Sequence, residues 1–503
     1  MNLQNIIKNH YYIFIILFFI CVPLNYIPNF WDGVVEDYAF TINDLRGVEN
    51  YYKEASRHSH LLFIYLVDFL SKKTSLHPEI FMDNFTVLFL FIFCYEVKKY
   101  SNLFFSLDSK WSNLAAAFTA IFPVWHTLIV YRLGLYLLFF YFVLIGYRYF
   151  IKKKIYHKIV GFLLIVISFG MNSNLSFVIG LVTVHFLICK FKNENDCQLK
   201  DVIFIIFIAI SSYLINNFFF PSYGLYEGYN TPYLPNLFSF NLLNNIFIFS
   251  IYFLHCAWIP IAYIFSVLLL KKEKKLNFKL SYNYLFLIVL AAFAVGPYLL
   301  VNRAPLFIFS EYFQRHAYLL GPIFGIFFAI LFKDISSIST LENKKILKFF
   351  IIIFIFQNLI LLSYGHYKKI ERYVYQENLI KELKNHGKIP KGNVKIISNN
   401  YPATLRNYET SFLFYKAYGS ASWYGNIVKN NEDDLKWLKL LLSKEEYRLN
   451  NIIKDYVYEC SSSIFLKNDL NRLQRIKKSY IFNSSKFFNI EKVTYDCEED
   501  ILK

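Results

Sequence analysis

Charged residues are scarce in this chain of 503 residues: they make up 18% of it, whereas about a quarter of an average soluble domain is charged. Glycine (17) and proline (13) are also few, which excludes a collagen-like chain. The seven cysteines show no metal-finger spacing and do not suit a small disulfide-stapled protein. Hydrophobic residues, in contrast, reach 56% and aromatic residues 20%. A single soluble core cannot hide that much apolar surface, so the composition excludes a soluble enzyme and predicts a polytopic α-helical membrane protein.

Apolar runs of membrane length recur along the first 365 residues. A spanning helix needs about 20 mainly apolar residues, and about eleven runs meet that requirement. A shorter apolar segment, 59–71, contains Asp68, and we expect it to be an interfacial helix on the outer face. The predicted spans lie near residues 11–29, 79–97, 112–130, 133–151, 156–171, 175–190, 201–220, 245–270, 281–301, 316–332 and 347–365.

Positive charge is placed between alternate spans. A net charge of +17 would suggest nucleic-acid binding in a soluble protein. Here, however, the lysines form short clusters such as Lys152–Lys154, Lys271–Lys275 and Lys344–Lys348, which is typical of cytoplasmic loops. We therefore expect a cytoplasmic N-terminus, an outer loop at 30–78, an extracytoplasmic segment after residue 365, and no nucleic-acid partner.

The last segment, residues 366–503, is more polar than the rest and long enough for its own α+β domain. A helix is predicted over Lys369–Asn385 and a buried strand over Asn393–Ser398. Cys460 and Cys497 both lie in this segment, so an oxidising compartment could join them. The sequence leaves that disulfide open.

Ionisable groups are nearly absent from the predicted spans. Arg148 lies at a helix end, where it can snorkel, and Glu96 and Asp201 also lie at helix ends. Ion- or proton-coupled transporters usually need carboxylates or histidines at the membrane midplane. The sequence therefore disfavours a coupled transporter, whereas an uncoupled lipid flippase stays open.

Acidic residues gather instead at the start of the first outer loop. Asp32, Glu36 and Asp37 lie within six residues, directly after the first span. Their mutual repulsion can raise the pKa of one carboxyl and suit it for general-base catalysis. The three could equally share a divalent cation, or they could cap a short helix in a solvated loop.

Cationic side chains are predicted on the same side of the membrane. Arginine binds phosphate through bidentate hydrogen bonds, so this group could hold a lipid-linked phosphate or diphosphate. Ordinary contact with lipid headgroups is the alternative. The six residues are Arg57, His58, His60, Arg303, Arg315 and His316.

The order of these features resembles the GT-C superfamily of integral-membrane glycosyltransferases. A retained first span leads into an acidic outer loop with an interfacial helix, and about ten spans and a C-terminal outer domain follow. In this resemblance, residues 1–365 are the GT-C-like transmembrane domain, and Glu36-Asp37 best matches the acidic motif of the family, with Asp32 a close rival. A clear second acidic motif is missing, so dependence on Mg²⁺ or Mn²⁺ stays open.

The resemblance implies inverting transfer of a sugar from a polyprenyl-phosphate or polyprenyl-diphosphate donor to a glycan, lipid or protein acceptor of the cell envelope. Asp37 or Asp32 would deprotonate the acceptor hydroxyl, with Glu36 assisting. Arg303, Arg315 and His316 would offset the charge on the departing phosphate. Two alternatives stay open: a lipid-linked oligosaccharide polymerase or ligase, and a non-catalytic scaffold or transporter for envelope lipids.

Overall fold

The computed structural model describes most of the residues between 46 and 386 and four strands after them. The chain divides into two compact units, one formed by Met1–Pro28 with Ser56–His366 and the other by Asn29–Ala55 with Tyr367–Lys503. The described residues are 46–76, 78–130, 133–152, 154–192, 199–224, 282–301, 312–338, 341–386, 393–397, 424–426, 461–468 and 488–495, with a few isolated positions elsewhere.

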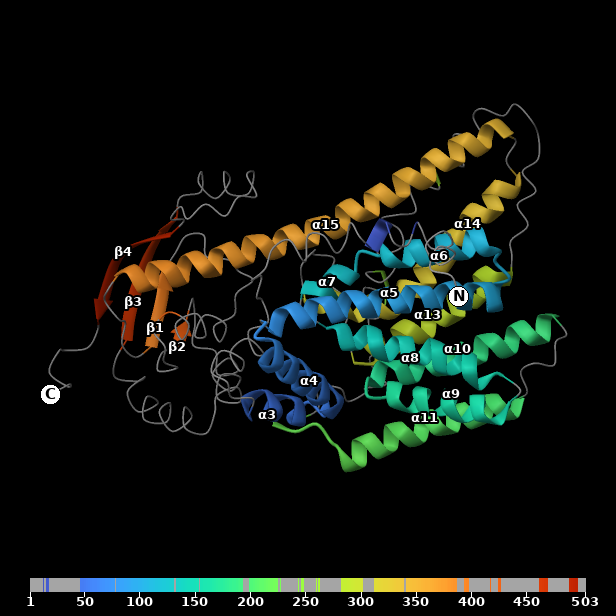
Figure 1. The fold of residues 1–503 in the computed structure, drawn as a ribbon, viewed down its shortest axis with the longest axis horizontal. Helices are drawn as coiled ribbons and strands as arrows, with labels where there is room; N and C mark the ends of the chain where they lie inside the picture. Colours follow the sequence, from blue (N-terminus) through green and yellow to red (C-terminus); the bar gives the residue numbers. More distant parts are fainter. Residues whose placement is uncertain are drawn as a thin grey trace. The chain divides into compact units, whose positions relative to one another are not determined.

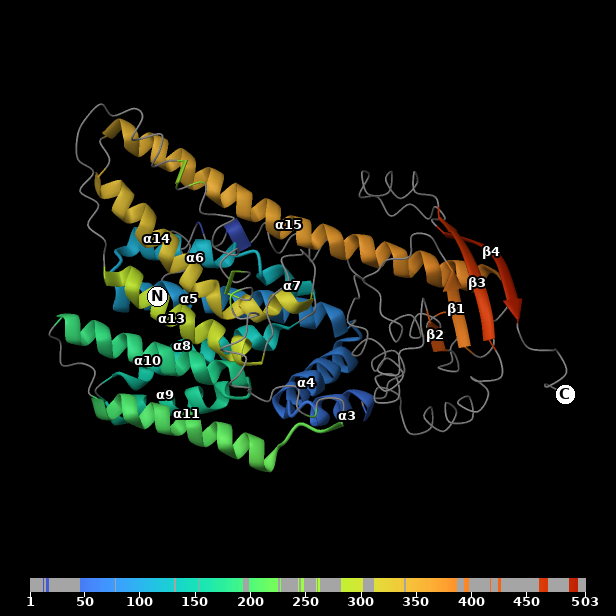
Figure 2. The same cartoon turned by 180° about the vertical axis from the view of Figure 1, so that it is seen from behind.

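The first unit is helical throughout its described part (Figure 1). Helices α5, α8, α10 and α13 run side by side, and the reverse view in Figure 2 agrees. The helices are α4 (His58–Thr74), α5 (Pro78–Phe105), α6 (Ser109–Ala120), α7 (Trp125–Val130), α8 (Gly134–Phe150), α9 (Ile155–Ser168), α10 (Asn172–Lys192), α11 (Leu199–Phe219), α13 (Tyr282–Leu300), the 3-10 helix η3 (Tyr312–Leu320), α14 (Gly321–Ile338) and the first part of α15 (Leu341–His386).

Six segments of the described residues are long and apolar enough to cross a membrane, and they coincide with six of the spans predicted from the sequence. Helices α8 and α9 are apolar but shorter, with 17 and 14 residues. Apart from a few isolated positions, the predicted spans 11–29 and 245–270 lie outside the described residues. The chain therefore has the helices of a multi-pass membrane protein, and the count of about eleven stays a prediction. The six segments are Ile80–Phe105, Asn172–Lys192, Leu199–Phe219, Tyr282–Leu300, Arg315–Ser337 and Lys345–Ser363.

Two predicted helices have different bounds in the structure. The run 112–130 is divided into α6 and α7, because Pro123 lies between them and proline can neither donate the helical hydrogen bond nor fit the preceding turn. The predicted helix Lys369–Asn385 is the last part of α15, which has no proline to end it before His386. The interfacial segment 59–71 falls within α4.

Aromatic side chains fill the space between the helices of the first unit. Phe140 of α8 contacts Phe93 of α5 and Phe177 of α10, with ring centroids 4.9 and 4.8 Å apart. Phe324 of α14 lies 4.7 Å from Phe122, beside the fully buried Trp125. Each such ring removes a large apolar area from its surroundings, so these contacts fix how the helices pack.

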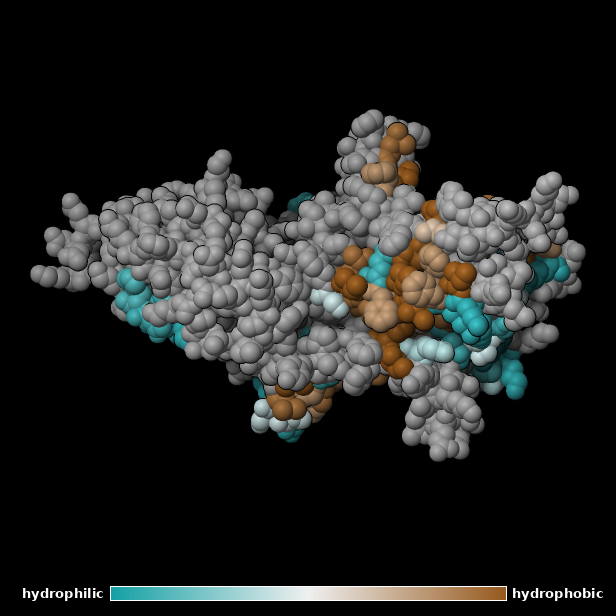
Figure 3. All heavy atoms as spheres, turned by 90° about the horizontal axis from the view of Figure 1, so that it is seen from above, coloured by the Kyte–Doolittle hydropathy of each residue, from teal (hydrophilic) through white to brown (hydrophobic). Residues whose placement is uncertain are grey.

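Other apolar side chains of the same unit point outward. Phe207 and Phe218 of α11 are 67% and 80% exposed, and Phe356 and Ile360 of α15 are 61% and 65% exposed. Figure 3 shows hydrophobic side chains gathered on the described part of one face. Exposed apolar stripes of this extent are unfavourable in water but match the surface of a helix that faces lipid tails.

Cationic residues collect where one set of helix ends meets, which we call the lysine-rich end. Arg148 near the end of α8 pairs with Glu96 of α5, and Lys192 at the end of α10 donates a 3.0 Å hydrogen bond to Ser106, just after α5. At the start of α11, Asp201 lies 3.9 Å from Nζ of Lys158, near the start of α9. This end carries Lys98, Lys99, Arg148, Lys152, Lys154, Lys158, Lys190, Lys192 and Lys200.

The second unit combines α3 (Arg46–Glu54), the last part of α15 and one four-stranded sheet. The strand order is β2-β1-β3-β4, with β1 parallel to β2 and β3, and β4 antiparallel to β3. Strand β1 coincides with the strand predicted at Asn393–Ser398. A complete α+β domain stays a prediction, and Cys460 and Cys497 lie outside the described residues. The strands are β1 (Asn393–Ile397), β2 (Tyr424–Asn426), β3 (Ser461–Asn468) and β4 (Phe488–Tyr495).

Candidate functional site

The candidate site lies away from the lysine-rich end, where α4, α8, α10 and η3 begin and α13 ends. Two predicted phosphate-binding residues converge there. Arg315 of η3 donates a hydrogen bond to the hydroxyl of Tyr136, near the start of α8, and the positive charge of Arg57 acts on the same hydroxyl. Arg315 is buried and Arg57 is half-buried. The positive charges of two guanidinium groups from distant parts of the chain therefore both act on the Tyr136 hydroxyl.

His60 lies beside this pair, on the first turn of α4. Its ring is 6.1 Å from that of Tyr136 and 6.4 Å from that of Phe139. Burial, and then the positive charge of Arg57, lower the pKa of His60 to about 3. His60 is consequently neutral at physiological pH, so it can offer a hydrogen-bond donor or acceptor there but no charge.

His316 joins the same cluster from the other side. Its buried ring stacks on Tyr298, near the end of α13, with centroids 4.9 Å apart. The Tyr298 hydroxyl hydrogen-bonds with Ser173 and Tyr318, and Ser173 lies 2.9 Å from the Tyr318 hydroxyl. Tyr318 in turn donates a 2.9 Å hydrogen bond to Asn174. These contacts link η3, α10 and α13 through polar groups rather than through apolar packing alone.

We call this assembly the Arg-Tyr cluster. It joins polar groups of α4, α8, α10, α13 and η3 and the turn before α4, and the ring of Tyr136 lies 5.3 Å from that of Tyr318, which connects its two halves. Its members are Arg57, His60, Tyr136, Ser173, Asn174, Tyr298, Arg315, His316 and Tyr318.

Close backbone packing holds these elements in position. A Cβ atom added at Gly321, the first residue of α14, would lie 2.2 Å from Cζ2 of Trp125. Asn174 also donates a 3.0 Å hydrogen bond to the carbonyl oxygen of Ser168, which fixes the turn between α9 and α10. The chain is therefore tightly packed at Gly321, six residues after Arg315, and at the turn before Ser173, an arrangement suited to a preorganised binding site.

The structure separates His58 from this group. Its exposed ring makes an edge contact with Phe220, just after α11, at 5.3 Å. Of the six predicted phosphate-binding residues, the structure brings Arg57, His60, Arg315 and His316 together. Arg303 lies outside the described residues.

The predicted catalytic acids Asp32, Glu36 and Asp37 also lie outside the described residues. Among the residues that are described, no group of three or more His, Cys, Asp or Glu side chains is placed to hold a metal ion. Whether Mg²⁺ or Mn²⁺ binds stays open.

Sequence reasoning missed the tyrosines of the cluster. Tyr136, Tyr298 and Tyr318 lie at helix ends, where tyrosine is common in any membrane protein because its ring suits the interface. Ser173 and Asn174 form part of a short link between two predicted spans. The only signal was position, since all five lie on the predicted outer side together with the arginines.

The arrangement can bind an anion. The positive charges of Arg57 and Arg315, which both act on the Tyr136 hydroxyl, would attract an anion placed near it. The guanidinium groups offer paired donors that match the oxygens of a phosphate, and the tyrosine and serine hydroxyls add further donors. Neutral His60 adds hydrogen-bonding capacity without adding charge.

Comparison with known proteins gives no relative from which a role could be transferred: no family model matches the chain, and no curated protein or solved structure is significantly similar to it.

Proposed function

We propose that this chain is an integral-membrane glycosyltransferase of the GT-C type, which transfers a sugar from a polyprenyl-phosphate or polyprenyl-diphosphate donor to an acceptor of the cell envelope. The observation that carries the proposal is the Arg-Tyr cluster: two arginines that converge on Tyr136 at one end of an apolar helical unit. A donor with a prenyl tail and a phosphate headgroup would place its tail along the apolar helices and its phosphate at that cluster.

The distribution of lysines supports an outward-facing site. Positive charge resists translocation, so the lysine-rich end is assigned to the cytoplasm and the Arg-Tyr cluster to the outer face. In the same assignment the N-terminus is cytoplasmic and the acidic loop at 30–78 is extracytoplasmic.

In the proposed reaction, Asp37 or Asp32 removes the proton of the acceptor hydroxyl, and Glu36 assists. The acceptor oxygen then attacks the anomeric carbon of the donor. The bond between that carbon and the phosphate oxygen breaks, and its electron pair leaves with the phosphate. Arg57 and Arg315 stabilise the negative charge that grows on this leaving group. Attack opposite the leaving group inverts the anomeric configuration.

The remaining parts of the chain have subsidiary roles in this proposal. The segment 366–503, as an extracytoplasmic α+β domain, would select the acceptor. Arg303 and His316 would add contacts to the phosphate. A divalent metal, if one is needed, would be held by the acidic loop.

The test is release of labelled sugar from a set of polyprenyl-phosphate sugars by the purified full-length protein, with and without divalent metal. We expect Asp32→Asn and Asp37→Asn to abolish transfer by folded protein. Asp68→Asn is the matched control, because Asp68 is an acid on the same predicted face that pairs with Lys72 at 2.8 Å on α4. Wild-type turnover in both loop variants would reject the assignment of the acids.

A further inference from the structure

A second candidate binding site lies at the lysine-rich end. A pocket of about 640 Å³ opens there among α5, α6, α8 and α10. Pockets that bind small ligands commonly measure several hundred cubic ångströms. Five cationic residues line it: Lys98, Lys99, Arg148, Lys152 and Lys192.

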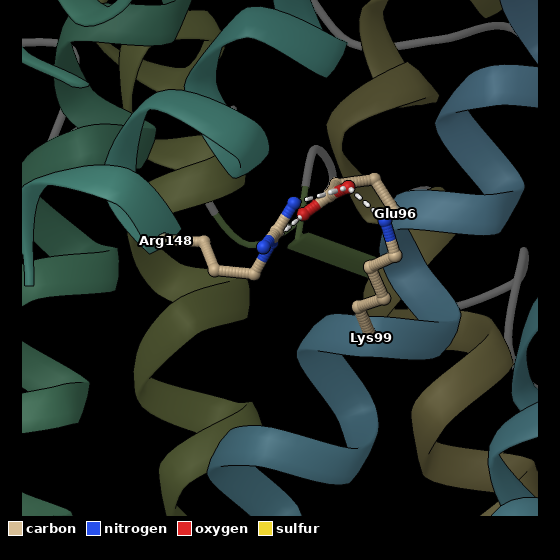
Figure 4. Close-up of polar contacts among 3 residues, drawn as sticks. All are labelled: Glu96, Lys99 and Arg148. Carbon is tan, nitrogen blue, oxygen red and sulfur yellow. Dashed lines mark hydrogen bonds and ion pairs between the residues drawn. The ribbon is translucent and has the colours of Figure 1, made fainter. Parts of the chain in front are cut away.

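Four of the five cations of this pocket contact neighbouring side chains. Figure 4 shows the Glu96 carboxylate between Arg148 and Lys99. It accepts hydrogen bonds from Nε and Nη2 of Arg148, the latter at 3.2 Å, and lies 3.7 Å from Nζ of Lys99. Nζ of Lys152 lies 4.3 Å above the ring of Tyr149, and Lys192 is hydrogen-bonded to a serine hydroxyl. Because these side chains are already restrained, less side-chain conformational entropy is lost when a ligand binds.

Positive charge predominates among the described residues of the pocket. Five of its lining side chains are cationic and none is acidic, and Glu96 pairs with two of the five. The first turn of α6 also reaches the pocket through Ser109, but the Asp108 carboxylate caps that helix start and accepts a hydrogen bond from the Trp111 N–H, so the cationic side chains alone give the pocket its positive character. The pocket therefore favours an anion with more than one negative oxygen.

The tendency of positive charge to stay on the cytoplasmic side accounts for lysines at this end, but it does not account for the gathering of five cations around one pocket. Lys154 and Lys190 belong to the same end, yet neither lines the pocket. The lining also includes apolar side chains, among them Leu103, Phe104 and Ile188. A lining that combines cations with apolar residues, at the ends of the membrane-length helices α5 and α10, matches a lipid headgroup with the first part of its chains.

We propose that this pocket binds a phosphate-bearing group, and specifically the phosphate of a membrane lipid headgroup on the side opposite the Arg-Tyr cluster. Lys98, Lys152 and Lys192 would contact the phosphate, and Arg148, fixed by Glu96, would contribute its outward N–H groups. The proposal is independent of glycosyl transfer, since it depends only on the described residues of this pocket. A soluble phosphate compound shares the same chemistry and is separated from a lipid by experiment.

The test compares two double variants of the purified full-length protein with equal loss of charge. Lys98→Gln/Lys152→Gln removes two lining cations, and Lys154→Gln/Lys190→Gln removes two cations of the same end outside the pocket. The probes are dioctanoyl phosphatidic acid, dioctanoyl phosphatidylcholine and inorganic pyrophosphate. Because the loss of even one hydrogen bond to a charged phosphate weakens binding roughly ten-fold, we expect the pocket variant to bind phosphatidic acid at least about 10-fold more weakly. The control should bind within two-fold of wild type.

Each outcome decides the proposal. Selective loss of phosphatidic acid binding in the pocket variant supports a lipid site. If wild type binds pyrophosphate as tightly as phosphatidic acid, and the pocket variant alone loses both, the site takes a soluble phosphate instead. Equal loss in both double variants, or wild-type binding in both, overturns the pocket. If the pocket variant does not fold, Ile151→Trp replaces it, because a large ring at this half-buried lining residue fills the space without changing charge. Unchanged phosphatidic acid binding in Ile151→Trp also overturns the proposal.

Discussion

Removal of one partner from the buried ion pair between Glu96 and Arg148 should destabilise the protein. The Glu96 side chain is 2% exposed and that of Arg148 is 17% exposed, and two hydrogen bonds join them. Glu96→Gln removes the negative charge and leaves the two cations facing each other across a neutral amide. Breaking a buried pair costs about 3–5 kcal/mol. Arg148 keeps some contact with its surroundings, so we expect a loss of about 2–3 kcal/mol in the free energy of unfolding.

Titration of the protein in mixed micelles with a denaturing detergent measures this loss in the free energy of unfolding. Glu96→Gln/Arg148→Gln should recover most of it, because neither charge is then left alone. Asp201→Asn is the control: Asp201 and Lys158 are 24% and 37% exposed and 3.9 Å apart, so their separation should cost under about 1 kcal/mol. A Glu96→Gln protein within about 0.5 kcal/mol of wild type would refute the reasoning. A double variant no more stable than the single one would refute it too.

Three further predictions concern packing, pH and orientation. A Cβ atom at Gly161 would lie 2.4 Å from the Phe150 nitrogen, so Gly161→Val should lose about 2 kcal/mol or more in the same unfolding assay, whereas the lipid-facing neighbour Val160→Ala should change little. The folded state holds the pKa of His60 at about 3, below the 6.5 of the unfolded chain, so His60 contributes its full stabilisation above pH 6.5. The free energy of unfolding should fall between pH 6.5 and pH 3, by at most about 1.4 kcal/mol per pH unit. His60→Gln should flatten that slope, and an unchanged slope would contradict the prediction. In a cysteine-free background, a membrane-impermeant maleimide should label Ser56→Cys on intact cells and Lys190→Cys only after permeabilisation, and the reverse result would invert the proposed orientation.

Much of the helical unit was predictable because lipid imposes a simple rule on sequence. Long apolar runs such as 175–190 and 201–220 correspond to α10 and α11 with small changes at the ends. The rule fails where local chemistry intervenes. Pro123 divides one run into two helices, and α15 extends past the apolar run because nothing in its sequence stops it.

The candidate site was predictable only in part. Arg57 and Arg315 were predicted to bind phosphate because of residue type and membrane side, but their convergence on Tyr136 depends on packing between distant segments. The pairing of Arg148 with Glu96 was missed for the same reason: each residue was interpreted as lying singly at a helix end. Hydropathy locates the ends of helices, whereas the contacts among them decide which ends meet.

The most direct test of the central claim is the affinity of the purified full-length protein for polyprenyl phosphate. Arg57→Gln removes one of the two charges at Tyr136, and Lys72→Gln, which removes a cation from exposed α4 surface, is the matched control. A hydrogen bond to a charged group contributes about 1.5–3 kcal/mol, so Arg57→Gln should weaken binding about 10- to 150-fold. Lys72→Gln should bind as wild type does. Equal affinity in Arg57→Gln and wild type would contradict the assignment of the Arg-Tyr cluster to the lipid phosphate.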